Sequence, residues 1–298
     1  MKEKIKIMLS LFMFLFLFPY IVTVFFQGIP VAGESLYESG TETAVAVSGD
    51  VQKDRDRLIA ILAKEISVNS EREAIRAQAV IVRANYAYAL AAGKEPEEGL
   101  SVQEMMAAFG EKNFAADYQI LAECVDDTAD ISVAYGTDTA VMLPYHAVSA
   151  GKTRAAAELP YLTSVDSTID LPSENYLKVI YFEKTEFLAQ LEQLFSGAAF
   201  VETDIPSQIT IDGRDDGGYV SSVTAGGITI TGDEFRERLG LASSCFRIAE
   251  ADGKVRIVTK GLGHGYGLSQ WGANELAKDG KDCIKILKYY FPNIEITE

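Results

Sequence analysis

Cysteine, histidine and tryptophan are scarce in this sequence. The chain of 298 residues contains three cysteines, two histidines and one tryptophan. The cysteines, Cys124, Cys245 and Cys283, are far apart and none belongs to a CxxC motif. Zinc knuckles need closely spaced thiolates and disulfide frameworks need several pairs, so the sequence indicates neither. All three cysteines lie among apolar residues, and we expect buried thiols.

Basic residues are also few. Lysine and arginine number 27 against 43 aspartates and glutamates, which gives a formal net charge of −16. This acidity disfavours nucleic acid as a partner, because phosphates need a basic face. It also disfavours peripheral binding to anionic lipid, although it is compatible with an integral anchor.

Two common catalytic motifs are absent. The sequence has no HExxH pair, so a zinc site would have to combine His146 and His264 with a thiolate or carboxylate. It has no GxSxG elbow, so a serine hydrolase would have to use Ser149 with His146. Each histidine is equally compatible with a hydrogen-bonded position in the core. We therefore predict no metal and no cofactor.

One long apolar run is present near the N-terminus. Residues 7–26 carry no charge, enough to span a bilayer as a helix. Lys2, Lys4 and Lys6 precede the run, and the segment after it carries glutamates but no lysine or arginine. The positive-inside rule then places the C-terminal part outside the cytoplasm. The alternative is a cleaved signal peptide with a weak small-residue site at residues 31–33.

The patterning after this run predicts three parts and an α+β fold. Residues 1–26 form the cytoplasmic N-terminus and the transmembrane anchor, residues 27–50 a linker, and residues 51–298 a single extracytoplasmic domain. Apolar residues at helical spacing predict a helix that ends near Glu65. Ser70 and Glu73 are typical of a capping box that opens a second, buried helix to about Leu90, and Gly93 closes it.

The remaining elements alternate between small antiparallel sheets and short helices. We predict strand, turn and strand in residues 125–143, strands in residues 209–211, 219–223, 227–230, 245–248 and 254–259, and helices in residues 185–195, 233–238 and 269–278, with a last helix capped by Asp282.

Two acids and one glycine-rich loop are candidates for function. Glu73 has a capping role to explain it, whereas Glu65 closes a helix within an apolar stretch. The helix dipole and burial should both raise the pKa of Glu65, which suits a general acid. The loop, residues 261–273, holds His264 and the only tryptophan, Trp271. Its glycines allow close backbone approach, either to a ligand or to a packed neighbour.

Four blocks of sequence occur in the order found in one known family. They are residues 63–66 and 73–80 with Arg83, residues 145–153 and 160–165, residues 231–241 with Ser244 and Phe246, and the loop of residues 261–273. Together they resemble the stage II sporulation protein D (SpoIID/LytB) family. Some positions depart from the family pattern, among them Ile66-Ser67 where methionine and proline are common.

The resemblance implies a lytic transglycosylase that cleaves peptidoglycan between MurNAc and GlcNAc during engulfment in sporulation. It maps the catalytic carboxyl onto Glu65. It maps groove-lining, substrate-binding positions onto Gln78, Arg83, His146, Ser149, His264, Ser269 and Gln270. It implies glycan strands stripped of stem peptides as the substrate, and stage II sporulation proteins P and M as partners. The alternative is a catalytically inactive glycan-binding or scaffold protein that keeps the groove.

Overall fold

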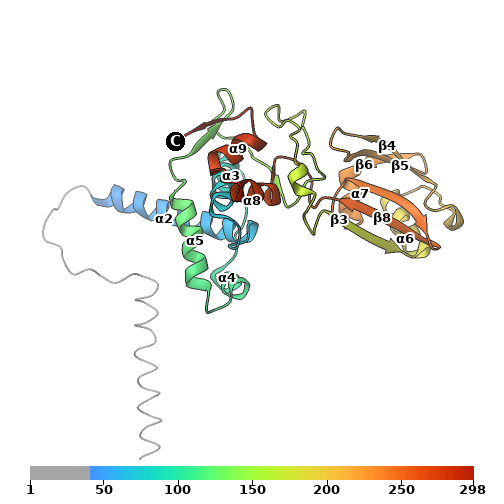
Figure 1. Ribbon diagram of the computed structural model, residues 1–298, viewed down its shortest axis with the longest axis horizontal. Helices are drawn as coiled ribbons and strands as arrows, with labels where there is room; N and C mark the ends of the chain where they lie inside the picture. Colours follow the sequence, from blue (N-terminus) through green and yellow to red (C-terminus); the bar gives the residue numbers. More distant parts are fainter. Residues whose placement is uncertain (1–40) are drawn as a thin grey trace, which may run out of the picture. The chain divides into compact units, whose positions relative to one another are not determined.

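The computed structural model describes residues 41–298 of the chain and places the side chains of residues 52–298 (Figure 1). This part contains eight α-helices and several short sheets, which confirms an α+β fold. Within it, no helix combines the length and apolar character that a bilayer span needs. The predicted transmembrane run, residues 7–26, lies outside the described residues.

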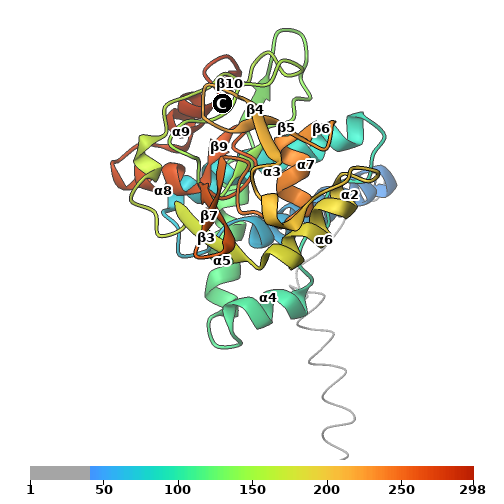
Figure 2. The same cartoon turned by 90° about the vertical axis from the view of Figure 1, so that its right-hand side faces the viewer.

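Helix α3 (Arg72–Ala91) is central to the helical part of the domain. One of its faces packs with α2 (Thr41–Glu65), α4 (Val102–Phe109) and α5 (Phe114–Asp126) in one apolar core. The opposite face packs with α8 (Gln270–Lys278) and α9 (Cys283–Tyr290) in a second core (Figures 1 and 2). Alanines at positions such as Ala74 and Ala77 let these neighbours approach closely. The prediction of a buried helix is confirmed, and we call this part the helical region.

Residues 177–260 form a second part, which we call the sheet region. Strands β3 (Leu177–Phe182), β8 (Lys254–Lys260) and β7 (Phe246–Ala251) make one antiparallel sheet in the order β3-β8-β7. Strands β4 (Ile209–Arg214), β5 (Val220–Ala225) and β6 (Ile228–Thr231) make another. Helices α6 (Lys184–Leu194) and α7 (Gly232–Arg238) share one apolar core with both sheets. The 3-10 turn η2 (Glu202–Asp204) precedes β4.

Two further sheets have two strands each. Strand β1 (Ser132–Ala134) pairs antiparallel with β10 (Glu295–Thr297). Strand β2 (Tyr145–His146) pairs parallel with β9 (Leu268–Ser269). The parallel pair departs from the predicted antiparallel sheets. It brings the two histidine-bearing segments of the chain side by side.

Two local predictions are wrong. Ser70 and Glu73 do not form a capping box, because α3 starts one residue later with Glu71 at its N-cap. Glu73 instead accepts a hydrogen bond from the backbone of Cys283 (2.8 Å) and pairs with Arg76 (2.9 Å). Its carboxylate thereby joins the start of α9 to α3.

The predicted strand, turn and strand of residues 125–143 is the second error. Helix α5 extends through Val125 to Asp126, and only β1 follows it as a strand. The turn itself is present, since Tyr135 and Asp138 exchange backbone hydrogen bonds. Helix α2 also begins at Thr41, so its first turns occupy the end of the segment expected to be a linker.

Candidate active site

Glu65 is the last residue of α2, as predicted. Its side chain is 17% exposed, and the residue is one of those that line an open pocket of about 420 Å³, with polar residues such as Ser67 and Asn69. The backbone carbonyl of Glu65 has no partner further along its helix and accepts a hydrogen bond of 2.6 Å from Gln270 Nε2. Glu65 is thus held at a helix C-terminus, next to a solvent-accessible pocket.

Three neighbours set the proton affinity of Glu65. Burial raises the pKa of its carboxyl group, and the nearby Glu97 raises this pKa further, while a hydrogen bond from Tyr145 and the charge of Lys64 act in the opposite direction. The net effect is a raised pKa. Lys64 Nζ lies 2.7 Å from Glu97 Oε1 and 3.8 Å from Glu65 Oε1, so one ammonium group lies between two carboxyl groups.

The loop that carries Glu97 is attached to α2. The backbone amide of Leu100 donates to the carbonyl of Ala60 (3.0 Å), and Lys64 Nζ donates to the carbonyl of Glu98 (3.3 Å). A Cβ atom at Gly99 would collide with the backbone of Ala60 and Ile61. Glycine is therefore required for this close approach, which keeps Glu97 near Glu65.

Gln78 and Gln270 join α3 and α8 behind Glu65. Gln78 is fully buried on α3, and its Oε1 lies 3.4 Å from Gln270 Nε2, the group that also bonds the Glu65 carbonyl. Gln78 Nε2 has no partner among the described residues. The structure thus brings three of the predicted site residues together, and one amide donor among them is free for a ligand or water.

The parallel pairing of β2 with β9 brings His146 opposite Ser269. His146 is 4% exposed, and burial lowers its pKa to about 3, so the ring is neutral. Its Nδ1 bonds the backbone carbonyl of Tyr266 (3.0 Å), and its Nε2 has no partner among the described residues. The rings of His146 and His264 lie 5.8 Å apart between centroids. His146, His264 and the glycine-rich loop are therefore neighbours, and we call them together the histidine strip.

The glycine-rich loop approaches His146 along its backbone. Gly263 has a φ of +109°, and a Cβ atom there would lie 2.8 Å from the Cβ of His146. Leu262 exchanges backbone hydrogen bonds with Val148 (3.0 and 2.7 Å). Trp271 is half-buried, and its backbone amide donates to Ala147 (3.0 Å). The loop therefore packs on the segment that begins at His146.

Ser149 and Ser269 are fully buried, and their hydroxyl groups bind nearby backbone amides. Ser149 Oγ accepts from the amide of Gly151 (3.1 Å), and Ser269 Oγ accepts from the amide of Gly272 (3.2 Å) as the N-cap of α8. Both segments meet Asp170, at the end of the 3-10 turn η1 (Thr168–Asp170), which accepts from the amide of Ser149 (2.6 Å). Burial raises the pKa of Asp170, and hydrogen bonds from Ser149 and Ser269 oppose the shift.

The side chain of Arg83 forms hydrogen bonds with the end of α5 and none with Glu65. Its guanidinium donates to the carbonyls of Val125 (2.6 Å) and Thr128 at the C-terminal end of α5. Free carbonyls at a helix end attract a cation, so this contact ties α3 to α5. The other six predicted substrate-binding residues lie on the segments around Glu65, His146 and His264.

Three residues that contact or influence this site were not predicted from the sequence. Tyr145 and Glu97 act on the proton affinity of Glu65, and Asp170 connects the two serine-bearing segments. Tyr145 precedes His146 in the sequence block of residues 145–153, so its place in that block could have identified it as a site residue. Glu97 and Asp170 lie outside every recognised motif.

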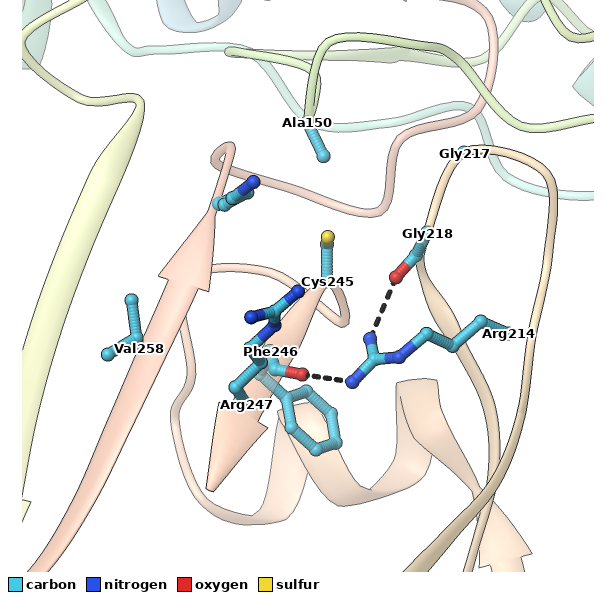
Figure 3. Close-up of a pocket in the computed structure, with 9 residues that line it drawn as sticks. Ala150, Arg214, Gly217, Gly218, Cys245, Phe246, Arg247 and Val258 are labelled. Carbon is cyan, nitrogen blue, oxygen red and sulfur yellow. Dashed lines mark hydrogen bonds between the residues drawn. The ribbon is translucent and has the colours of Figure 1, made fainter. Parts of the chain in front are cut away.

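Metal ligands and thiols do not gather at this site. Among the residues that the structure describes, no group of three or more His, Cys, Asp or Glu side chains could hold a metal ion. The three cysteines are free; Cys124 and Cys283 are buried as expected, whereas Cys245 is half-buried. Cys245 lies in a separate pocket of about 170 Å³ in the sheet region (Figure 3). Arg214 also lines that pocket and donates to the carbonyls of Gly218 and Phe246.

Comparison with known proteins identifies the family. The chain is 30% identical over 259 residues to a Bacillus amyloliquefaciens protein named stage II sporulation protein D, which covers 81% of this chain and 73% of the relative. The chain belongs to the stage II sporulation protein D family. A second member, from Bacillus subtilis (strain 168), is 36% identical over 140 residues, 47% of this chain and 39% of its own.

A shorter part of the chain is also similar to a protein with a different name. The amidase enhancer of Bacillus subtilis (strain 168) is 34% identical over 73 residues, 24% of this chain and 10% of its own. No protein-family model matches the chain. The resemblance stated from the four sequence blocks is confirmed by the two sporulation proteins.

Proposed function

We propose that this protein is a lytic transglycosylase that cleaves glycan strands of peptidoglycan between MurNAc and GlcNAc during sporulation. Membership of the stage II sporulation protein D family supports the sporulation context. The observation that carries the reaction type is Glu65. Its carboxyl group has a raised pKa, the residue lines an open pocket, and Gln270 and Lys64 contact it, while Glu97 lies on the other side of Lys64 as a second carboxyl group.

One carboxyl group can carry out both proton transfers of this reaction. Protonated Glu65 donates its proton to the glycosidic oxygen as the bond from that oxygen to C1 of MurNAc breaks. The same carboxylate then removes the proton from the C6 hydroxyl of MurNAc, whose oxygen forms the new bond to C1. The products are a free GlcNAc 4-hydroxyl and a 1,6-anhydro ring, and no water is consumed. A raised pKa favours the first transfer near neutral pH.

The neighbouring groups have complementary roles in this proposal. Tyr145 and Lys64 keep the carboxyl group in place, and Lys64 moderates the repulsion between Glu65 and Glu97. The unpartnered amide of Gln78 and the neutral ring of His146 are buried, so they would reach sugar hydroxyls through a bridging water. No step needs a metal or a cofactor.

The proposed cellular setting completes the picture. Residues 7–26 would anchor the protein in the cell membrane as a single span, with the remaining chain outside the cytoplasm. The substrate would be glycan strands from which an amidase has removed stem peptides. Stage II sporulation proteins P and M would be its partners during engulfment.

Replacement of Glu65 tests the proposed reaction. The full chain in detergent is incubated with glycan strands that lack stem peptides, and the products are examined by mass spectrometry. We expect anhydro-muramic ends, and we expect Glu65→Gln to reduce their rate of formation by about 10²- to 10⁴-fold, since it removes the proton donor. Glu98→Gln is the matched control, because Glu98 is an exposed acid of the neighbouring loop.

Two outcomes would contradict the proposal in different ways. Glycan binding without any cleavage by the wild-type chain would favour the alternative of a scaffold that keeps the groove. Loss of cleavage in Glu73→Gln but not in Glu65→Gln, with both variants folded, would assign the reaction to the wrong acid. The structure disfavours Glu73, because both of its oxygens already bind Cys283 and Arg76.

A further inference from the structure

Most polar side chains in the segment from Thr231 to Arg238 contact other side chains or cap the helix, whereas Arg236 does not. Thr231 caps α7 by accepting from the amide of Glu234 (3.0 Å). Asp233 pairs with Arg154 (2.8 Å), and Glu234 lies 3.8 Å from Arg238. Arg236 remains, and its Nε is buried without a hydrogen-bond partner among the described residues. A buried guanidinium nitrogen without an acceptor is costly, so it calls for a ligand or a water.

Arg236 lines a pocket of about 420 Å³ between the sheet region and the glycine-rich loop. A second cation, Lys178 of β3, lines the same pocket, and neither cation forms an ion pair with any side chain of residues 52–298. The other lining residues are glycine or apolar residues such as Leu241, except for Thr259. Two uncompensated positive charges in a pocket are unusual in a chain of net charge −16.

This pocket adjoins the histidine strip of the candidate active site. Ala147 and Gly263 line it. Ala147 follows His146 in the sequence, and Gly263 packs against the side chain of His146. The positive charge of Arg236 also acts on His264. A polymer that lies along the strip past Glu65 and the histidines would therefore pass the mouth of the pocket.

We propose that Arg236 and Lys178 form a subsite for the free lactyl carboxylate of a muramic acid in the glycan strand. The inference rests on the function proposed above. A guanidinium presents N–H donors in a fork that matches a carboxylate, and Lys178 adds a point charge. While a stem peptide is attached, the lactyl group is a neutral amide. The subsite therefore selects strands whose peptides have been removed.

The pocket in Figure 3 supplies a contrast within the same region. Arg214 there already donates to two backbone carbonyls, at 2.8 Å from Gly218 and 2.7 Å from Phe246. That arginine ties the loop before β5 to the start of β7. Arg236 has no such partner, which is why its charge is available to a ligand.

The test compares two glycans that differ only in charge. A tetrasaccharide of alternating GlcNAc and MurNAc is prepared with free lactyl carboxylates and, separately, with the same groups converted to methylamides. Binding is measured by calorimetry on the full chain in detergent with Glu65→Gln, so that the sugar stays intact. We expect the acid to bind about tenfold more tightly than the amide, as one charge-assisted contact provides.

Variants of the pocket should remove this preference without removing binding. Arg236→Gln should bring the affinity for the acid close to that for the amide, while the affinity for the amide stays unchanged. Lys178→Gln, on an exposed strand position that tolerates substitution, should reduce the preference in part. Arg238→Gln is the matched control, because it removes an equal charge from the solvent side of the same helix, 62% exposed.

Each result supports or overturns a definite statement. Equal affinity of the unsubstituted pocket for both glycans, or an unchanged preference in both Arg236→Gln and Lys178→Gln, overturns the subsite and leaves the cleavage proposal intact. A free stem peptide has carboxylates but no sugar. If it competed with the acidic tetrasaccharide for binding, the pocket would recognise a peptide carboxylate and not the lactyl group, and the proposal would be overturned. Failure to bind either glycan would reject the subsite and the proposed function together.

Discussion

The helical region and the sheet region differ in the polar groups that they offer to a ligand. Around α3 these are the acid Glu65, the amide of Gln78 and the neutral imidazole of His146, whereas the guanidinium of Arg76 is paired with Glu73. In the pocket beside α7 they are cations, Arg236 and Lys178. The first set suits proton transfer and hydrogen bonding to sugar hydroxyls, and the second suits a fixed negative charge. Under the proposals above, one region performs the chemistry and the other recognises charge on the same strand.

Arg154 connects these two regions, and its replacement should have the largest effect on stability. Burial alone would lower the pKa of Arg154, but ion pairs with Asp233 and Asp215 (2.8 and 2.7 Å) outweigh burial. Arg154→Met would leave two partly exposed carboxylates without their cation. We expect a loss of about 2 to 3 kcal/mol in the free energy of unfolding, measured by urea denaturation.

A control variant sharpens this first comparison. Arg256 is exposed on β8, so Arg256→Met removes the same charge without removing a buried ion pair. Its effect should stay within about 0.5 kcal/mol. If both variants lost the same amount, the ion pairs of Arg154 would not be what holds the two regions together.

His146 should make the stability of the helical region depend on pH. Burial lowers its folded-state pKa to about 3, below the value of about 6.5 for an unfolded chain. The neutral ring is therefore favoured by folding, and its stabilising contribution is present above pH 6.5 and is lost as the pH falls towards 3. His264, the other ionisable group beside the ring, opposes its protonation as well.

The measurement is the melting temperature between pH 7.5 and 4.5. His146→Gln keeps a polar side chain but cannot titrate, so its melting temperature should fall less than that of the wild type over this range. Parallel decreases in the two proteins would mean that His146 is protonated in the folded state or is not buried.

Gln270 should affect cleavage while leaving the fold in place. Its Nε2 holds the carbonyl of Glu65 and lies near Gln78. Gln270→Ala removes one hydrogen bond, which is worth about 1 kcal/mol, and we expect kcat for cleavage to fall about fivefold to tenfold. Lys278→Ala, on an exposed position of the same helix, should leave the rate unchanged. A rise in KM at constant kcat would instead make Gln270 a substrate contact only.

The regular elements of both regions were largely predictable from the sequence. Helix α3 and its closing Gly93, α9 with Asp282 as its N-cap, and the β4-β5-β6 sheet follow from periodicity, caps and turns. Strand β3 was missed, because its residues are apolar without alternation and their exposed face carries Leu177 and Tyr181. The Ser70 capping box failed because the tertiary contact of Glu73 with α9 outweighs a local cap.

The candidate site was predictable only where a motif marked it. Glu65 was a candidate because of its place at the end of an apolar helix, where burial raises its pKa. Arg83 was expected at the groove, but its guanidinium binds the end of α5, a contact set by how two helices pack. Glu97 and Asp170 come from loops far along the chain, so no local pattern could place them beside Glu65 or Ser149.

Glu97 gives the smallest and most specific effect, a shift of the pH profile of cleavage. Glu97 raises the pKa of Glu65, and it also engages Lys64, whose charge lowers that pKa. Glu97→Gln removes the first influence and leaves Lys64 free to act on Glu65, so both changes lower the pKa. A general acid must be protonated, and cleavage should therefore decline at a lower pH than in the wild type. Glu98→Gln removes an equal charge from the next residue and should leave the profile in place. A shift to higher pH would mean that Glu97 lowers the pKa of Glu65 and would contradict this prediction.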